Sequence, residues 1–136
     1  MNWVVDTCIV IDILENDPEF GLLSAKFLEA RLADGLEISP ITQVELAPAF
    51  HGDLGEQKTF LRLAGIQFEN SWSVQDTEEA HRAWHRHIMG RRKRTVTKRP
   101  VADLLIGAFA MNRRGLITRN AGDFRKAFPD LTLLEP

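Results

Sequence analysis

The stretch GLITRNAGDF, residues 115–124, has the pattern of a buried strand that leads into a helix. A glycine is followed by three residues that suit a sheet, 116–118, and then by the polar pair Arg119 and Asn120. Asp123 comes three residues after Asn120, as in a helix-capping pair with Asp in place of Glu. Capping alone explains this polar exit. A metal site also explains it, if carboxylates from other segments point to the same place.

Strand-like and helix-like segments alternate on both sides of this stretch. We expect short strands at residues 2–5, 36–39, 66–70, 116–118 and 131–135. We expect helices at about residues 8–15, 18–34, 40–48, 54–65, 76–89, 100–114 and 121–128. This alternation predicts an α/β fold, with a mostly parallel sheet covered on both faces, in a single domain over residues 1–136.

The composition fits one globular domain of ordinary size. The chain has 136 residues, of which 44% are hydrophobic, and this is enough for one core. Cys8 is the single cysteine, so no internal disulfide can form. The N-terminus has neither a basic lead nor a small-residue cleavage site, and no stretch has the apolar length of a membrane span. We therefore expect a soluble, cytoplasmic protein without membrane contact.

The net charge of −2 hides a strong asymmetry along the chain. Residues 1–79 hold 15 acidic and 4 basic side chains (−11), whereas residues 80–136 hold 4 acidic and 13 basic ones (+9). The densest basic run is RRKRTVTKR, residues 91–99, with six Lys or Arg in nine positions. We expect this run to form a loop. It is either a solvated loop or a surface for an anionic partner. The run alone does not indicate whether that partner would be RNA, DNA or an acidic protein.

Three aspartates lie where a helix is expected to begin after a strand or loop. Asp6 directly follows the first strand, Asp103 lies in the first turn of the helix after Pro100, and Asp123 follows Asn120. Each position also has a structural explanation: a helix N-cap for Asp6, interaction with the helix dipole for Asp103, and a capping pair for Asp123. No one of the three is diagnostic by itself.

A glutamate on the expected helix after Pro40 is more informative. Ile41, Val44 and Pro48 form an apolar stripe there, and Glu45 lies on the same stripe, four residues after Ile41. Burial of an ionised glutamate on an inward face is costly unless something compensates its charge. The alternative is that the helix is rotated and Glu45 reaches solvent.

The four carboxylates favour a common site when they are considered together. Open parallel sheets bind ligands beyond the carboxyl ends of their strands, where these residues are expected. Clustered carboxylates cannot all ionise without a cation, and Mg²⁺ or Mn²⁺ suits oxygen ligands. Such an ion activates a water and neutralises a phosphodiester. An acidic cleft beside a basic rim therefore predicts a nuclease.

Four stretches spread over nearly the whole chain carry a family resemblance. They are VVDTCIVIDIL (residues 4–14), SPITQVEL (39–46), PVADLLIGAFA (100–110) and GLITRNAGDF (115–124). In this order they resemble the PIN-domain ribonucleases, in particular the VapC-type toxins of type II toxin–antitoxin systems. The most specific piece is TRN followed by DF; Thr7 departs mildly from the more usual serine but keeps the hydroxyl.

The resemblance implies the fold and the site. It implies a PIN-like three-layer fold with a five-stranded parallel sheet. It also implies an acidic site for Mg²⁺ or Mn²⁺ whose metal ligands are also the catalytic residues. These are Asp6, Glu45, Asp103 and Asp123. Polar groups that line or brace this site would be Thr7, Thr118 and Asn120.

The resemblance also implies an activity and partners. The protein would be a metal-dependent endoribonuclease toxin that hydrolyses single-stranded or loop regions of RNA. A cognate VapB-type antitoxin would inhibit it, and the toxin would form a homodimer. The basic side chains that we expect to contact RNA are Arg91, Arg92, Lys93, Arg94, Lys98, Arg99 and Arg119.

Two other classes of protein remain as alternatives. A catalytically silent PIN-like module would bind RNA or a partner without cutting, although the intact carboxylates argue against it. A receiver-type phosphoacceptor domain would need an acidic pair at the first strand and a lysine after a late strand, and neither is evident.

The pair His81 and His85 has zinc-ligand spacing, but an exposed amphipathic helix is the better interpretation.

Overall fold

The computed structural model describes residues 1–92 and 101–136. Five strands form one sheet: β1 (Trp3–Val5), β2 (Leu36–Glu37), β3 (Ile66–Gln67), β4 (Gly115–Ile117) and β5 (Leu133–Leu134). Their order is β3-β2-β1-β4-β5, and every neighbouring pair is parallel. The predicted five-stranded α/β fold is confirmed, and each strand starts where the sequence pattern placed it or within two residues of that position.

Helices connect the strands in the order that the pattern predicted. The α-helices are α1 (Thr7–Leu14), α2 (Gly21–Glu29), α3 (Pro40–Glu45), α4 (Leu54–Leu63), α5 (Val74–Arg92), α6 (Val101–Met111) and α7 (Ala121–Ala127). Two short 3₁₀ helices, η1 (Leu32–Asp34) and η2 (Ala47–Phe50), follow α2 and α3. The single helix expected over residues 18–34 is therefore α2 plus η1.

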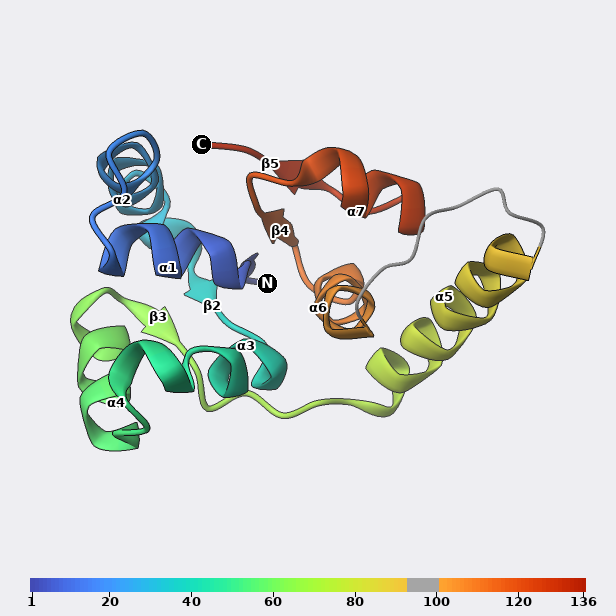
Figure 1. Ribbon diagram of the computed structural model, residues 1–136, viewed down its shortest axis with the longest axis horizontal. Helices are drawn as coiled ribbons and strands as arrows, with labels where there is room; N and C mark the ends of the chain where they lie inside the picture. Colours follow the sequence, from blue (N-terminus) through green and yellow to red (C-terminus); the bar gives the residue numbers. More distant parts are fainter. Residues whose placement is uncertain (93–100) are drawn as a thin grey trace.

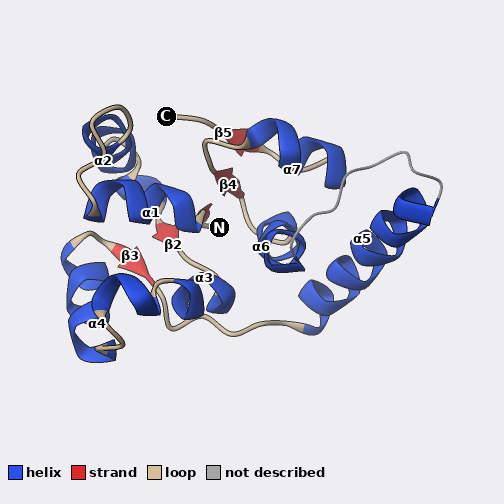
Figure 2. Cartoon of the chain, in the orientation of Figure 1, coloured by secondary structure: helices blue, strands red, loops and turns tan. Residues whose placement is uncertain are grey.

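The sheet divides the hydrophobic core into two clusters. Trp3 and Val5 face a cluster built with α1, α2 and α4, whereas Val4 between them faces a second cluster built with α5, α6 and α7. Ile117 and Leu116 of β4 alternate in the same way, because successive strand residues point to opposite faces. Each such fully buried aliphatic side chain contributes about 1.5–3 kcal/mol. Figures 1 and 2 show the resulting three layers.

The strand order reverses at the centre of the sheet. The chain adds β2 and β3 on one side of β1 and then crosses back to add β4 and β5 on the other. Parallel α/β sheets bind ligands at such a switch point, beyond the carboxyl ends of the strands. In this chain the switch point lies where β1 ends at Val5 and β4 ends at Ile117.

The basic run lies only partly within the described residues. Arg91 and Arg92 are the last two residues of α5, so the expectation of a loop from residue 91 is wrong at these positions. The pattern missed this because polar residues alone give a helix no apolar stripe to detect. The predictions for Lys93, Arg94, Lys98 and Arg99 lie outside the described residues.

Candidate active site at the carboxyl edge of the sheet

Asp6 lies at the switch point, directly after β1. It is the N-cap of α1, and its Oδ1 accepts a hydrogen bond of 2.8 Å from the Thr7 amide, so its predicted capping role is confirmed. Its side chain is buried, with the residue only 5% exposed. The second oxygen, Oδ2, accepts a hydrogen bond of 2.7 Å from the Thr118 hydroxyl, which arrives from the end of β4. The two central strands therefore meet at this carboxylate.

Thr118 is held from both sides. The residue is fully buried, and its Oγ1 accepts a hydrogen bond of 3.0 Å from the Asn120 amide while it donates to Asp6. Asn120 precedes α7, but its side chain makes no capping hydrogen bond to that helix. Its side-chain nitrogen instead lies 4.0 Å from the Cys8 sulfur. The polar exit after β4 is thus explained by contacts across the switch point.

Glu45 reaches the same place from α3. The Thr7 hydroxyl lies 2.7 Å from Glu45 Oε1, so Thr7 contacts Asp6 through its amide and Glu45 through its side chain. Glu45 is exposed, not buried on an inward stripe. The alternative of a rotated helix is therefore correct, since Val44 is 74% exposed and the buried residue of α3 is Thr42.

A row of hydroxyl groups connects Glu45 to the end of β2. Ser39 caps α3 through the Thr42 amide at 3.1 Å. The Ser39 hydroxyl lies 3.4 Å from that of Thr42, which lies 2.9 Å from that of Thr7. Because a carboxylate can only accept, the Thr7 proton points to Glu45 and Thr7 accepts from Thr42. The fully buried Thr42 thereby fixes the direction of the Thr7 hydroxyl. No local pattern in the sequence marked Thr42 as part of the site.

The electrostatics of the site disfavour charge on Asp6. Burial raises the pKa of the Asp6 carboxyl, hydrogen bonds from Thr118, Cys8 and Thr7 lower it, and the nearby charge of Glu45 raises it; the net direction is upward. Burial and the charge of Asp6 raise the pKa of the Cys8 thiol to about 12, so Cys8 stays protonated at neutral pH. An opposite charge brought to this site would relieve both effects.

The donor set suits a divalent cation in kind. Carboxylate and hydroxyl oxygens are ligands that Mg²⁺ and Mn²⁺ accept. Within residues 1–92 and 101–136, however, no three His, Cys, Asp or Glu side chains lie close enough together to hold a metal ion. The contacts described above join Asp6 and Glu45 through Thr7.

The topology places the other two predicted carboxylates at the same edge of the sheet. Asp103 is half-buried in the first turn of α6, which ends four residues before β4 begins and so starts at the carboxyl edge. Asp123 is exposed in the first turn of α7, which starts directly after β4 leaves the sheet. α3 and α6 are in contact, which brings the helices of Glu45 and Asp103 together. Convergence of all four side chains stays a prediction.

Arg119 has a partner within the chain. Its Nε lies 2.6 Å from Asp12 Oδ2 and its Nη2 lies 3.1 Å from Asp12 Oδ1. Asp12 is only 3% exposed, and it was not among the site residues predicted from the sequence. The other predicted RNA contacts in the described residues, Arg91 and Arg92, are exposed at the end of α5.

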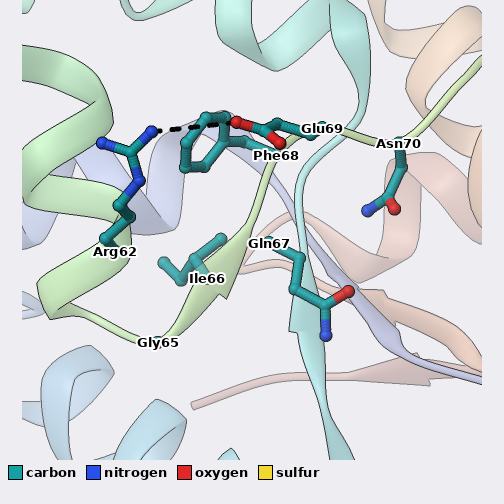
Figure 3. Close-up of a pocket in the computed structure, with 7 residues that line it drawn as sticks. All are labelled: Arg62, Gly65, Ile66, Gln67, Phe68, Glu69 and Asn70. Atoms are coloured by element: carbon teal, nitrogen blue, oxygen red, sulfur yellow. Dashed lines mark ion pairs between the residues drawn. The ribbon is translucent and has the colours of Figure 1, made fainter. Parts of the chain in front are cut away.

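A hollow of about 450 Å³ lies along the edge strand β3, away from these residues. Figure 3 shows its lining, in which Arg62 pairs with Glu69 at 3.8 Å beside the Phe68 ring. None of the predicted site residues lines it.

The described helices include none with the length and apolar character needed to cross a bilayer.

Comparisons with known proteins define the class of this chain. A sequence profile described as the PIN domain matches residues 3–128. The chain therefore belongs to the PIN domain family. No curated protein matches it in sequence.

Two solved structures share the fold over nearly the whole chain. The structure of VapBC-1 from nontypeable Haemophilus influenzae contains a chain with a TM-score of 0.70 and 21% identity, covering 99% of this chain and 98% of that one. The structure of VapBC2 from Rickettsia felis, bound to a DNA fragment from their promoter, contains a chain with a TM-score of 0.68 and 20% identity, at the same coverage.

Proposed function

We propose that this PIN domain is a metal-dependent endoribonuclease, a VapC-type toxin controlled by a VapB-type antitoxin. PIN domains are generally nucleases, and the similar solved chains come from VapBC structures. The observation that carries the proposal is the buried Asp6 at the switch point, which is linked through Thr7 to Glu45 and through its own hydrogen bond to Thr118.

In this proposal Mg²⁺ or Mn²⁺ is held by Asp6 and Glu45, with Asp103 and Asp123 completing the ligand set. Such an ion, when bound, supplies Lewis-acid activation of a water and charge neutralisation at a phosphodiester. The chain orients the first two ligands: Thr118 and the Thr7 amide fix the Asp6 carboxylate, and the Thr7 hydroxyl fixes Glu45. The basic residues near positions 91–99 hold the RNA backbone.

Cleavage of an RNA panel by antitoxin-free protein tests the activity. Wild type is expected to cut in Mg²⁺ or Mn²⁺ and not in EDTA, leaving a 5′-phosphate and a 3′-hydroxyl. Asp6→Asn should be slower by about 10²–10³-fold, the usual loss when a group that stabilises transition-state charge is removed. Asp34→Asn is the matched control, because Asp34 is an exposed acid just before β2, at the opposite edge. Equal rates for Asp6→Asn and wild type would remove the acidic site from the mechanism.

An apolar hollow offers a surface for the antitoxin. It measures about 430 Å³ and is lined by side chains of α1, α2, α4 and the segments after them, including Leu32 and Leu63. Leu63 is 85% exposed and Leu32 is 46% exposed, which is unusual for clustered leucines with no partner to cover them.

Leu63→Asp should weaken the complex with the cognate VapB-type antitoxin and leave RNA cleavage unchanged. Leu54→Asp is the control, because Leu54 is 54% exposed on the same helix and lies outside the lining of the hollow. Equal antitoxin affinity for both variants would place the antitoxin elsewhere.

A catalytically silent binding module is the second candidate. The absence, among the described residues, of three acidic, His or Cys side chains close enough for a metal ion favours it. Tight RNA binding by wild type, measured by fluorescence anisotropy, without metal-dependent cleavage would support this function over the nuclease.

A further inference from the structure

The Asp12–Arg119 ion pair is a charged contact between distant segments that lies beside the predicted acidic site. It joins α1 to the segment after β4, residues 107 positions apart in the chain, through two hydrogen bonds of 2.6 and 3.1 Å. The guanidinium also lies over the Phe20 ring, 4.8 Å from its centroid. Arg119 therefore contacts α1 and the turn that leads into α2.

Arg119 stands between two residues of the site. Thr118 before it donates to Asp6, and the amide of Asn120 after it donates back to Thr118. Asp6 and Asp12 belong to the same element, as the N-cap and a buried residue of α1. Six residues of helix span about 9 Å, so the segment after β4 is attached to α1 at two separated points. The Thr118 amide also donates to Leu134 O on the β5 side, so the ion pair adds a second attachment on the α1 side of the segment.

We propose that Asp12 and Arg119 are positioning residues, which hold the Thr118–Asn120 segment against α1 so that the Thr118 hydroxyl stays on Asp6. The proposal rests on the proposed nuclease function of the same site. It assigns to Arg119 a role in place of the RNA contact expected from its charge.

Burial argues that Arg119 does not leave Asp12 for a phosphate. The Asp12 side chain is 4% exposed and that of Arg119 is 35% exposed. Removal of the cation would leave a buried carboxylate without its charge partner, which is strongly unfavourable. A bidentate fork also fixes the guanidinium plane, which a lysine cannot reproduce.

The test compares Asp12→Asn, Arg119→Lys and the double variant in the RNA cleavage assay. Each single variant should lower kcat about 10–100-fold with KM within about twofold, since small displacements of catalytic groups reduce rate more than affinity. The double variant should be no worse than the more affected single variant, because both changes break one contact. Arg119→Lys keeps the charge, so a loss of kcat in this variant shows that the fork geometry matters.

Asp76→Asn is the control for a general loss of stability. Asp76 forms a buried ion pair with Arg113 near the start of β4, at the opposite edge of the sheet. All variants are assayed below their melting temperatures, and Asp76→Asn should keep the wild-type kcat. The proposal is overturned if Asp12→Asn keeps the wild-type kcat, if Arg119→Lys changes only KM, or if Asp76→Asn loses kcat equally.

Hydrogen–deuterium exchange separates failure of this proposal from failure of the proposed function. The amides of residues 118–124 should exchange faster in Asp12→Asn and Arg119→Lys than in wild type or Asp76→Asn. If wild type cuts no RNA, the nuclease function fails, and the amide exchange rates alone test whether Asp12 and Arg119 position this segment. Unchanged exchange rates at residues 118–124 in both variants would overturn the positioning role.

Discussion

Two buried aspartates at opposite edges of the sheet are in opposite electrostatic situations. Asp6 lies beyond the carboxyl end of β1, and the donors described for it are neutral: the Thr7 amide, the Thr118 hydroxyl and the Cys8 thiol. Asp76 lies at the start of α5, near the amino end of β4, and its Oδ1 is 2.5 Å from the Arg113 guanidinium. Both carboxylates are out of water, but the described contacts provide a cation for Asp76 alone.

The pKa values follow this difference. Burial raises the pKa of Asp76, but hydrogen bonds from the Ser73 amide, Asn112 and Arg113, together with the charge of Arg113, outweigh burial and lower it. At Asp6 burial prevails and the pKa is raised. A structural carboxylate carries its counter-charge within the fold, whereas a carboxylate held without one is typical of a site that receives a cation.

The largest expected effect is on stability at the amino edge. Asp76→Ala should lower the free energy of unfolding by about 3 kcal/mol, the lower end of the range for a broken buried ion pair, because Arg113 would keep only Glu37, 3.8 Å away, as a charge partner. The measurement is urea unfolding followed by circular dichroism. The contrast between the two edges would be lost if this variant unfolded at the wild-type urea concentration.

The second effect concerns Asp6 and metal. Without metal, Asp6→Asn should have a melting temperature at or above that of wild type, because a carboxyl with a raised pKa is unfavourable to ionise in the fold at pH 7. Mg²⁺ or Mn²⁺ at about 100 times its Kd should stabilise wild type by about 2.7 kcal/mol. Asp6→Asn should lose most of this shift and Asp34→Asn should keep it. An equal gain in stability on metal addition in all three proteins would show that the ion binds elsewhere.

The smallest effect is a dependence on pH at Asp76. A folded pKa below the unfolded value gives stability that is present above the unfolded pKa and lost as pH falls through the folded one. The difference in unfolding free energy between wild type and Asp76→Asn should therefore be constant above about pH 5 and shrink below about pH 4. A difference that grows on acidification would contradict this assignment.

Local patterns in the sequence predicted the elements but not every orientation. Pro40 marked the start of α3 correctly, yet the stripe through Ile41, Val44 and Pro48 predicted the wrong inward face. A helix of six residues is too short for its apolar spacing to define a face. The inward position is set by Thr42, whose hydroxyl partner on Thr7 is 35 residues away.

Pairs between distant segments were the other gap. Asp12 was not predicted as a site residue, and Arg119 was predicted only as part of a polar pair and as an RNA contact. Their pairing depends on the register of β1 against β4, which no local pattern specifies. Asp6 was identified because its position after a strand and the family motif both pointed to it.

The bond between Thr118 and Asp6 spans 112 residues, from the first strand to the segment after the fourth. Contacts of such long sequence separation form only after a large loop has closed, so they come late in folding. During synthesis, Asp6 emerges from the ribosome long before Thr118 exists. A nascent or truncated chain that ends before β4 therefore lacks the geometry of the site, which can form only after Thr118 has been synthesised.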